Sequence, residues 1–338
     1  MAKCALITGS AGFIGYHLSK LLLDHGYKVV GLDGFSDYYD VTLKRRRHEM
    51  LSQSPGFVPV EGLLEADGLV MELFATHAPD VVVHLAGQAG VRWSIENPRA
   101  YVDANLVGSF NILEAARAHR PAHLLMASTS SAYGANTQMP YRETDKADAQ
   151  VSFYAATKKA NESMAHSYAH LFDIPTTMFR FFTVYGPWGR PDMAPYLFTS
   201  AILEGRPIKV YNHGNMQRDF TYVTDLVEGI RLLIDAAPER PENAEAIAAD
   251  DSLSAVAPWR IVNIGNGAPV KLMEFIEAIE AATGIEAEKN FMDMQPGDVP
   301  ATWADTTLLK RLTGYAPSMS VQDGMKEFVS WYRDYYDA

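Results

Sequence analysis

The 338-residue sequence predicts an α/β protein built around a doubly wound parallel sheet. Short apolar runs alternate with helical patterns through the first half, as is typical of parallel strands that are covered on both faces. The first run leads directly into a glycine-rich turn, and 48% of the residues are apolar, which is enough for a large core. These observations indicate a Rossmann-type domain that comes first in the chain.

Five apolar runs are expected to form strands of this sheet. They are Cys4 to Thr8, Lys28 to Asp33, Val81 to Ala86, His123 to Ser128 and Thr176 to Phe182. The first helix is expected to open in the turn after Thr8 and to end at Gly26, because glycine is favoured just beyond a helix C-terminus. Its apolar face would carry Ile14, Leu18, Leu21 and Leu22.

Beyond Phe182 the alternation stops, and proline, glycine and aromatic residues become frequent. We therefore expect residues 1–182 to form the Rossmann domain and residues 183–338 to form mainly a smaller, loop-rich C-terminal substrate lobe. Residues 223–265 are expected to return to the first domain. Further elements are expected at Asp225 to Ala237, Ile261 to Ile264, Leu272 to Ala282 and Val321 to Tyr335, with 239–258 as a surface excursion.

Charge and composition exclude several classes of protein. The 29 Lys and Arg residues against 41 Asp and Glu give a net charge of -12, which repels nucleic acid and anionic membranes. The single cysteine, Cys4, lies in an apolar run and is expected to be a buried, inert thiol. No apolar run reaches the roughly 18 residues of a membrane span, and no signal peptide is recognisable. We expect a cytoplasmic protein without a metal site.

A dinucleotide site is predicted where the first strand meets the first helix. The run from Thr8 to Gly15 has the pattern GxxGxxG, whose glycines let the backbone approach a pyrophosphate at a helix N-terminus. Asp33 ends the second strand, where its carboxylate can accept the adenosine ribose hydroxyls and would repel a 2′-phosphate. NAD is therefore favoured over NADP. The predicted contacts of the turn are Gly9, Ala11, Gly12, Phe13, Ile14 and Gly15.

The basic cluster Lys44 to Arg47 is the counter-argument, because arginines near this position could hold a 2′-phosphate. We interpret the cluster as the solvated face of a helix. His84, inside an apolar strand, is interpreted as a hydrogen-bonded strand residue rather than as a catalyst.

A catalytic pair is predicted at Tyr154 and Lys158. Residues four apart share a helix face, so the Lys158 ammonium is expected beside the Tyr154 phenol, where it would favour the ionised phenol and make it a base. The hydroxyl cluster Ser128 to Ser131 ends an earlier strand, and ligands in open α/β sheets bind beyond the carboxyl ends of strands.

These residues resemble the extended short-chain dehydrogenases/reductases that modify nucleotide sugars, and the resemblance runs from Thr8 to the segment Gln295 to Val299. Within that family the chain is most similar to bacterial UDP-glucuronate 4-epimerases. The segments that carry this similarity are Ser36 to Asp40, Gln88 to Arg92, Phe181 to Ala194 and Val299 to Thr302. One departure is Leu63, where relatives commonly carry an Asp that meets the adenine.

The resemblance implies reversible epimerisation of UDP-glucuronate to UDP-galacturonate at carbon 4, through a 4-keto intermediate, with bound NAD recycled in each turnover. Tyr154 would take the hydroxyl proton, Lys158 would hold the nicotinamide ribose, and Thr129 would bridge the oxygens. Leu85 and Ala86 would contact the cofactor. The resemblance also implies a homodimer that pairs through a four-helix contact including the helix of Tyr154.

The resemblance also implies a substrate site and leaves alternatives open. Dehydratases carry an Asp-Glu pair at the positions of Ser130 and Ser131, decarboxylases carry a Glu at the position of Ser131, and neutral-hexose epimerases generally carry Asn at the position of Thr183. A neutral UDP-hexose 4-epimerase, a UDP-glucuronate decarboxylase and a non-catalytic NAD sensor remain alternatives. The UDP-sugar residues expected are Arg92, Thr129, Ser130, Ser131, Thr183, Arg190, Arg218 and Asp298, with Arg218 on the diphosphate, Asp298 on the uridine ribose and Arg92 alternatively in an ion pair.

Overall fold

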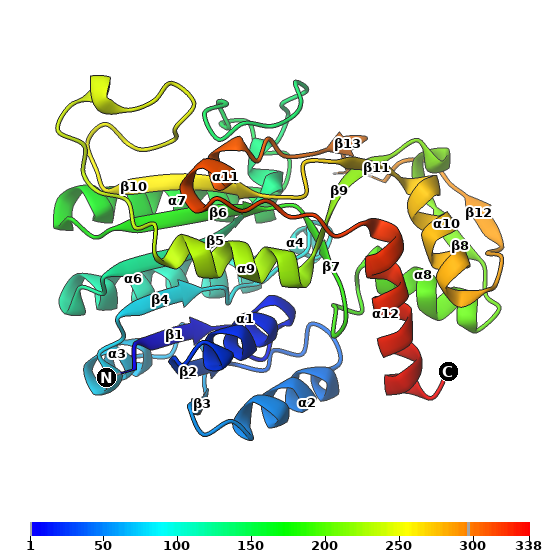
Figure 1. Ribbon diagram of the computed structural model, residues 1–338, viewed down its shortest axis with the longest axis horizontal. Helices are drawn as coiled ribbons and strands as arrows, with labels where there is room; N and C mark the ends of the chain where they lie inside the picture. The colour runs from blue at the N-terminus through cyan, green and yellow to red at the C-terminus, as the bar shows by residue number, and fades with distance from the viewer. Residues whose placement is uncertain (1, 296–297) are drawn as a thin grey trace.

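A seven-stranded parallel sheet forms the centre of the computed structural model, which describes residues 2–295 and 298–338 (Figure 1). Pro296 and Gly297 of the Gln295 to Val299 segment lie outside these ranges. The strand order is β10-β6-β5-β4-β1-β2-β3, so the predicted doubly wound fold is confirmed. The strands are β1 (Cys4–Thr8), β2 (Lys28–Asp33), β3 (Phe57–Glu61), β4 (Val81–His84), β5 (His123–Thr129), β6 (Thr176–Phe181) and β10 (Trp259–Ile264).

Helices cover both faces of this sheet because side chains of each strand alternate between two cores. Ala5 and Ile7 of β1 lie in one core, whereas Cys4 and Leu6 lie in the other. The first core includes α1 (Phe13–Asp24), α2 (Val41–Ser52), α9 (Val223–Ile234) and α11 (Thr307–Thr313). The second includes α3 (Leu69–His77), α6 (Gly108–His119) and α7 (Phe153–Phe172).

A second lobe packs beyond the carboxyl ends of the strands, to the right of the sheet in Figure 1. Its core is aromatic and includes Phe220 stacked on Phe275, with ring centroids 4.1 Å apart. Its strands are β7 (Thr183–Tyr185), β8 (Ile208–Val210), β9 (Gln217–Tyr222), β11 (Pro269–Lys271), β12 (Lys289–Phe291) and β13 (Ala301–Thr302). Its helices are α8 (Ala194–Leu203), α10 (Leu272–Thr283) and α12 (Val321–Tyr336).

Six short helical elements complete the described part of the chain. They are α4 (Trp93–Glu96), α5 (Pro98–Tyr101), the π-helix η1 (Val102–Val107) and the 3-10 turns η2 (Ser130–Tyr133), η3 (Tyr211–Gly214) and η4 (Ala244–Ala246). The segment 239–258 contains only η4 as regular structure and forms the loop above β10, as expected. Cys4 is buried, as predicted. In the part of the chain that the structure describes, no helix has the length and apolarity of a membrane span.

The basic cluster on α2 contradicts the prediction of a solvated face at two of its four positions. Lys44 and Arg47 are buried, and the Lys44 ammonium donates to the carbonyl and hydroxyl oxygens of Ser36 at 2.6 and 3.0 Å. Arg45 and Arg46 are exposed and pair with acidic neighbours. The prediction failed because the two buried side chains are bonded to oxygens of residues outside α2, those of Ser36, Ala11 and Trp188, which the local sequence pattern does not reveal.

Candidate active site

The glycine turn between β1 and α1 is closed so tightly that side chains would not fit. A Cβ on Gly9 would lie 2.9 Å from the Ala86 nitrogen, and a Cβ on Gly15 would lie 2.0 Å from the Gly9 oxygen. No side chain caps the start of α1 at Gly12. The turn therefore presents a helix N-terminus to a ligand, and the chemistry suits a pyrophosphate. The predicted contacts Ala11, Phe13 and Ile14 follow along the same turn.

Asp33 lies beside this turn at the end of β2. Its two carboxylate oxygens accept the backbone N–H groups of Ala11 at 3.0 Å and of Phe35 at 2.8 Å. A carboxylate has about four acceptor positions, so two remain for ribose hydroxyls. These residues fit the adenosine half of NAD. Leu63, which stands where relatives commonly carry an Asp, is exposed next to Gly34.

The end of β4 forms the opposite wall of the dinucleotide site. The Leu85 N–H donates to the Thr8 carbonyl at 3.3 Å, and the Ala86 N–H donates to the Thr8 hydroxyl at 3.2 Å. His84 is fully hydrogen-bonded, to Thr8 at 2.8 Å and to Ser109 at 3.0 Å, and burial lowers its pKa to about 3. A neutral, doubly bonded imidazole fits a structural role, as predicted for this residue.

The predicted catalytic pair lies on the first two turns of α7. The Ser152 hydroxyl caps this helix by accepting the Ala155 N–H at 3.1 Å, which fixes where the helix begins. Lys158 is buried and donates to the Ala127 carbonyl of β5 at 3.2 Å. Tyr154, one turn earlier, is partly exposed. The structure thus brings both residues to the end of β5, beside Thr129.

The electrostatics of Tyr154 differ from the expectation. Burial raises the pKa of the phenol, while the Thr129 hydroxyl and the positive charge of Arg190 oppose that rise. Lys158 is not among the causes, because its ammonium is turned toward Ala127, and burial lowers its own pKa to about 8. In this structure Thr129 and Arg190, rather than Lys158, oppose the rise of the Tyr154 pKa, so the expected effect of the Lys158 ammonium on Tyr154 stays a prediction.

Hydroxyl groups gather where β5 and β6 end. The Thr129 hydroxyl accepts the Ser131 N–H at 3.2 Å, which starts the turn η2 with Ser130 and Ser131 both partly exposed. Thr129 is in register with Phe181 of β6, two residues before Thr183. Thr183 begins β7 and is partly exposed. Four hydroxyl residues therefore lie at or just after the carboxyl ends of β5 and β6, the side of the sheet at which the start of α7 places Tyr154.

Arg92, which precedes α4 of the first domain, meets two predicted substrate residues of the second lobe, Arg218 and Asp298. Arg92 forms an ion pair with the Asp298 carboxylate at 3.3 Å. An ion pair is the alternative to substrate binding that the sequence left open for Arg92. The positive charge of Arg218 is also close to Asp298, and burial lowers the pKa of its guanidinium. Arg218 donates to the Pro300 carbonyl at 3.2 Å. A desolvated guanidinium binds an anionic diphosphate more strongly than an exposed one.

Arg190 is placed by the loop after β7. Its guanidinium makes two hydrogen bonds to Asp192, one of them 3.0 Å long, and Tyr38 donates to the same carboxylate at 3.0 Å. The Asp192 carboxylate offsets burial and raises the pKa of Arg190. Arg190 thereby stays charged close to Tyr154. Its contact with a substrate remains a prediction.

Sequence reasoning missed the residues that hold these groups in place. Asn105 in the π-helix η1 accepts the Gln88 N–H at 2.7 Å and donates to the Thr157 hydroxyl at 3.0 Å. Tyr101 donates to the Ala89 carbonyl at 2.8 Å, and its ring meets Tyr154 edge-on at 6.1 Å. A π-helix inside a longer helical segment is often found at functional sites, but it has no simple sequence signal.

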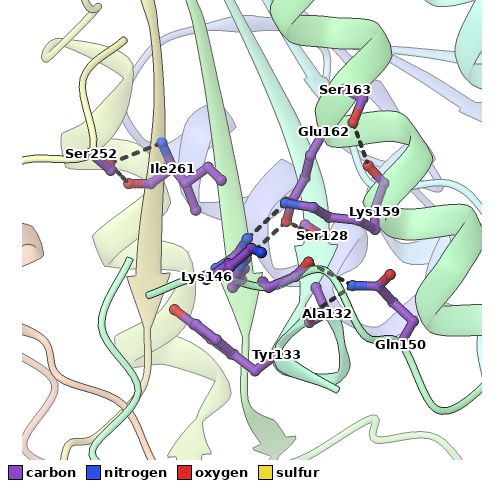
Figure 2. A network of polar contacts seen from close by, with 12 residues as sticks. Ser128, Ala132, Tyr133, Lys146, Gln150, Lys159, Glu162, Ser163, Ser252 and Ile261 are labelled. Atoms are coloured by element: carbon purple, nitrogen blue, oxygen red, sulfur yellow. Dashed lines mark hydrogen bonds and ion pairs between the residues drawn. The ribbon is translucent and has the colours of Figure 1, made fainter. Parts of the chain in front are cut away.

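A buried ionic network behind the site was also missed (Figure 2). Glu162 on α7 accepts the Ser128 hydroxyl at 2.7 Å, Arg180 at 2.9 and 2.8 Å and the Lys159 ammonium at 3.0 Å. Burial would raise the pKa of Glu162, but Arg180, Lys159 and Ser128 together outweigh burial and lower it. The network ties α7 to β5 and β6, directly behind Thr129.

The site combines a dinucleotide turn, the Tyr154–Lys158 pair and hydroxyl groups at strand ends. Together these features define a nucleotide-dependent enzyme of the extended dehydrogenase/reductase type. The model of the NAD dependent epimerase/dehydratase family matches residues 5–247, and the chain belongs to this family. The resemblance found in the sequence is thereby confirmed.

Individual relatives cover nearly the whole chain. It is 55% identical to the probable UDP-glucuronate 4-epimerase of Rhizobium meliloti, over 98% of this chain and 97% of that protein. It is 44% identical to UDP-glucuronate 4-epimerase 4 of Arabidopsis thaliana, over 98% of this chain and 75% of that one. The UDP-glucuronic acid 4-epimerase of Bacillus cereus, solved with UDP-glucuronic acid and NAD, has a TM-score of 0.86 and 32% identity, covering 98% and 100% of the two chains.

Proposed function

We propose that this protein is a UDP-glucuronate 4-epimerase that interconverts UDP-glucuronate and UDP-galacturonate with NAD as a resident cofactor. The observation that carries the proposal is the set of neutral hydroxyls at Thr129, Ser130, Ser131 and Thr183 next to the partly exposed Tyr154 and the buried Lys158. Relatives that share almost the full length of the chain support it.

The chain's own groups have distinct tasks in this reaction. Tyr154 would take the proton of the sugar 4-hydroxyl and return it after the sugar has turned over, with Thr129 bonded to both oxygens. NAD, when bound, supplies reversible hydride transfer at carbon 4. Within the chain, the Thr129 hydroxyl and the positive charge of Arg190 oppose the rise of the Tyr154 pKa that burial causes.

The hydroxyl groups would decide the fate of the oxidised sugar. A uronate oxidised at carbon 4 is a β-keto acid, which loses carbon dioxide when its carboxylate bond aligns with the carbonyl π system. Thr183 and the Ser131 region would hold the carboxylate out of that alignment by hydrogen bonds. No carboxylic acid is placed at Ser130 or Ser131 to catalyse dehydration.

We also propose which part of the chain binds which ligand, the oligomeric state of the enzyme and its location in the cell. Residues 1–182 together with 223–265 would bind NAD, and this is supported by β10 pairing with β6 in the main sheet. The remainder of 183–338 would bind the UDP-sugar. A homodimer in the cytoplasm is proposed, with the outer face of α6 and α7 as the contact.

The test is to incubate the purified protein with UDP-glucuronate, without added nucleotide, and to follow products by proton NMR. UDP-galacturonate should form, and Tyr154→Phe should slow its formation by about a hundredfold or more while binding is kept. A UDP-pentose as the main product would replace the proposal with a decarboxylase. Faster turnover of UDP-glucose would replace it with a neutral-hexose epimerase.

A further inference from the structure

Arg47 has an unusual environment for a surface-helix arginine. Its side chain is fully buried in α2, although its neighbour Arg46 is exposed. In residues 2–295 and 298–338 no carboxylate forms an ion pair with Arg47, and its guanidinium is bonded to neutral oxygens only. Burying a charge without a counter-charge is costly, so a compensating anion is expected nearby.

The guanidinium joins two segments that lie far apart in the sequence. One terminal nitrogen donates to the Ala11 carbonyl at 2.8 Å and to the Tyr39 hydroxyl at 3.2 Å. The other donates to the Trp188 carbonyl at 2.9 Å. Ala11 belongs to the glycine turn, and Trp188 belongs to the loop that leads to Arg190.

At the glycine turn, Arg47 provides the last of the hydrogen bonds that hold the two peptide groups of Ala11 in place. The Ala11 N–H donates to Asp33, and its carbonyl accepts Arg47. The Gly12 N–H, in the same planar unit as that carbonyl, donates to the Gly9 carbonyl at 2.9 Å. The turn is therefore held in one shape, and the Arg47 charge lies next to the helix N-terminus that suits a pyrophosphate.

On the side of the loop, Arg47 holds a backbone conformation that is unfavourable for a large residue. Trp188 has a φ of +61°, in the left-handed region that bulky residues rarely adopt. The Arg47 bond and an aromatic cluster with Tyr16 and Trp331 hold it there. The neighbouring Pro187 carbonyl accepts His17 of α1 at 2.9 Å, so the loop is fixed to two helices of the NAD domain.

We infer that Arg47 is a positioning residue that couples the dinucleotide turn to the substrate loop, so that a bound pyrophosphate and a correctly placed Arg190 stabilise each other. The proposed function supplies the two ligands, and this inference rests on it. By linkage, the coupling works in both directions: a dinucleotide strengthens UDP binding, and UDP strengthens dinucleotide retention.

The experiment measures binding and does not depend on turnover. UDP affinity is determined by calorimetry on the NAD-loaded protein, and NAD retention is determined by assaying nucleotide after gel filtration. Arg47→Met should weaken UDP binding about tenfold and lose about half of the NAD or more. Arg47→Lys, whose single ammonium cannot serve both carbonyls, should lose less. Arg46→Met, one position away and exposed, should change neither quantity.

A double variant distinguishes positioning from simple stabilisation. If Arg47 acts through the loop, Arg47→Met should have little further effect on UDP affinity once Arg190→Met is present, although the two residues make no direct contact. Additive losses would overturn the inference. A variant that unfolds at lower temperature but keeps wild-type UDP affinity and NAD content would also overturn it. Failure of the proposed epimerase activity would leave both binding measurements interpretable.

Discussion

Thr183 is the residue on which the choice of substrate depends most directly. Thr183→Val keeps the β-branched shape that suits the start of β7 and removes one hydroxyl donor. Loss of one hydrogen bond to a charged group costs about 1.5 to 3 kcal/mol, so turnover of UDP-glucuronate should fall by roughly tenfold or more. A less restrained carboxylate should also release carbon dioxide more often, with reduced NAD left on the enzyme.

The measurement is product analysis by NMR with both UDP-glucuronate and UDP-glucose as substrates. The ratio of the two turnover rates should shift toward UDP-glucose in the variant, because only the uronate loses a partner. An unchanged ratio, with neither a UDP-4-ketopentose nor a UDP-pentose formed, would remove Thr183 from the carboxylate site.

Glu143 is a buried carboxyl group outside the reaction centre, and it makes stability depend on pH. It accepts the Asn263 N–H at 2.8 Å, and burial raises its pKa to about 7. Between pH 4.5 and 7 the folded protein therefore keeps a proton that the unfolded chain releases, so this group lowers stability as pH rises through that window.

Glu143→Gln keeps an acceptor for Asn263 and has no charge to bury. Relative to wild type, the variant should gain up to roughly 3 kcal/mol of unfolding free energy on going from pH 4.5 to pH 8. Urea unfolding at these two pH values measures the difference. A constant difference between the two proteins would show that Glu143 titrates normally.

Single residues could be predicted from the sequence where a strand end or a turn places them. Asp33, Thr129 and Tyr154 have fixed positions in a repeating β-α pattern, and these are the residues that the sequence located. The role of Arg47 could not be predicted, because two of its three partners are backbone oxygens 36 and 141 residues away, which have no sequence signal.

Helix α7 and strand β6 show how an element is held by charge rather than by apolar packing alone. Arg180 and Glu162 are each about 1% exposed, so removal of one partner leaves the other charged and buried. Arg180→Met should therefore cost about 3 to 5 kcal/mol of unfolding free energy, reduced to the extent that Lys159 compensates. Since Glu162 also holds Ser128, turnover should fall as well.

Denaturant unfolding measures this cost, and Arg99→Met provides the matched control. Arg99 pairs with Asp103 on the surface and is 80% exposed, so its loss should change stability by less than about 1 kcal/mol. If both variants lost the same small amount, the network would contribute no more than a surface ion pair.

Helices and strands could be predicted from the sequence where their apolar residues follow a regular pattern. Strands β1 and β2 begin and end where the sequence indicated, since every residue from Cys4 to Thr8 is buried. The π-helix η1 and the short strands of the second lobe had no such pattern. Their shape comes from contacts between segments, such as β9 pairing with β7 and β11, which local sequence does not encode.

At the scale of the whole molecule, the outer face of α6 and α7 exposes large apolar side chains. On α6, Phe110 is 47% exposed, and on α7, Leu171 is 66% exposed. The two helices pack side by side, and Tyr168 of α7 bonds Glu114 of α6 at 2.5 Å, so they form a continuous outer face. Apolar residues gathered on two adjacent helices are typical of a helix-pairing interface.

A charge placed on this face should separate the proposed dimer. In a two-fold interface each substitution acts twice, so Phe110→Glu brings two carboxylates into the contact and removes two aromatic anchors. We expect the wild type to run as a dimer and Phe110→Glu as a monomer in light scattering after gel filtration. Phe291→Glu, at an equally exposed position on β12 in the other lobe, should remain dimeric. A monomeric wild type, or a Phe110→Glu variant that stays dimeric, would move the interface elsewhere or remove it.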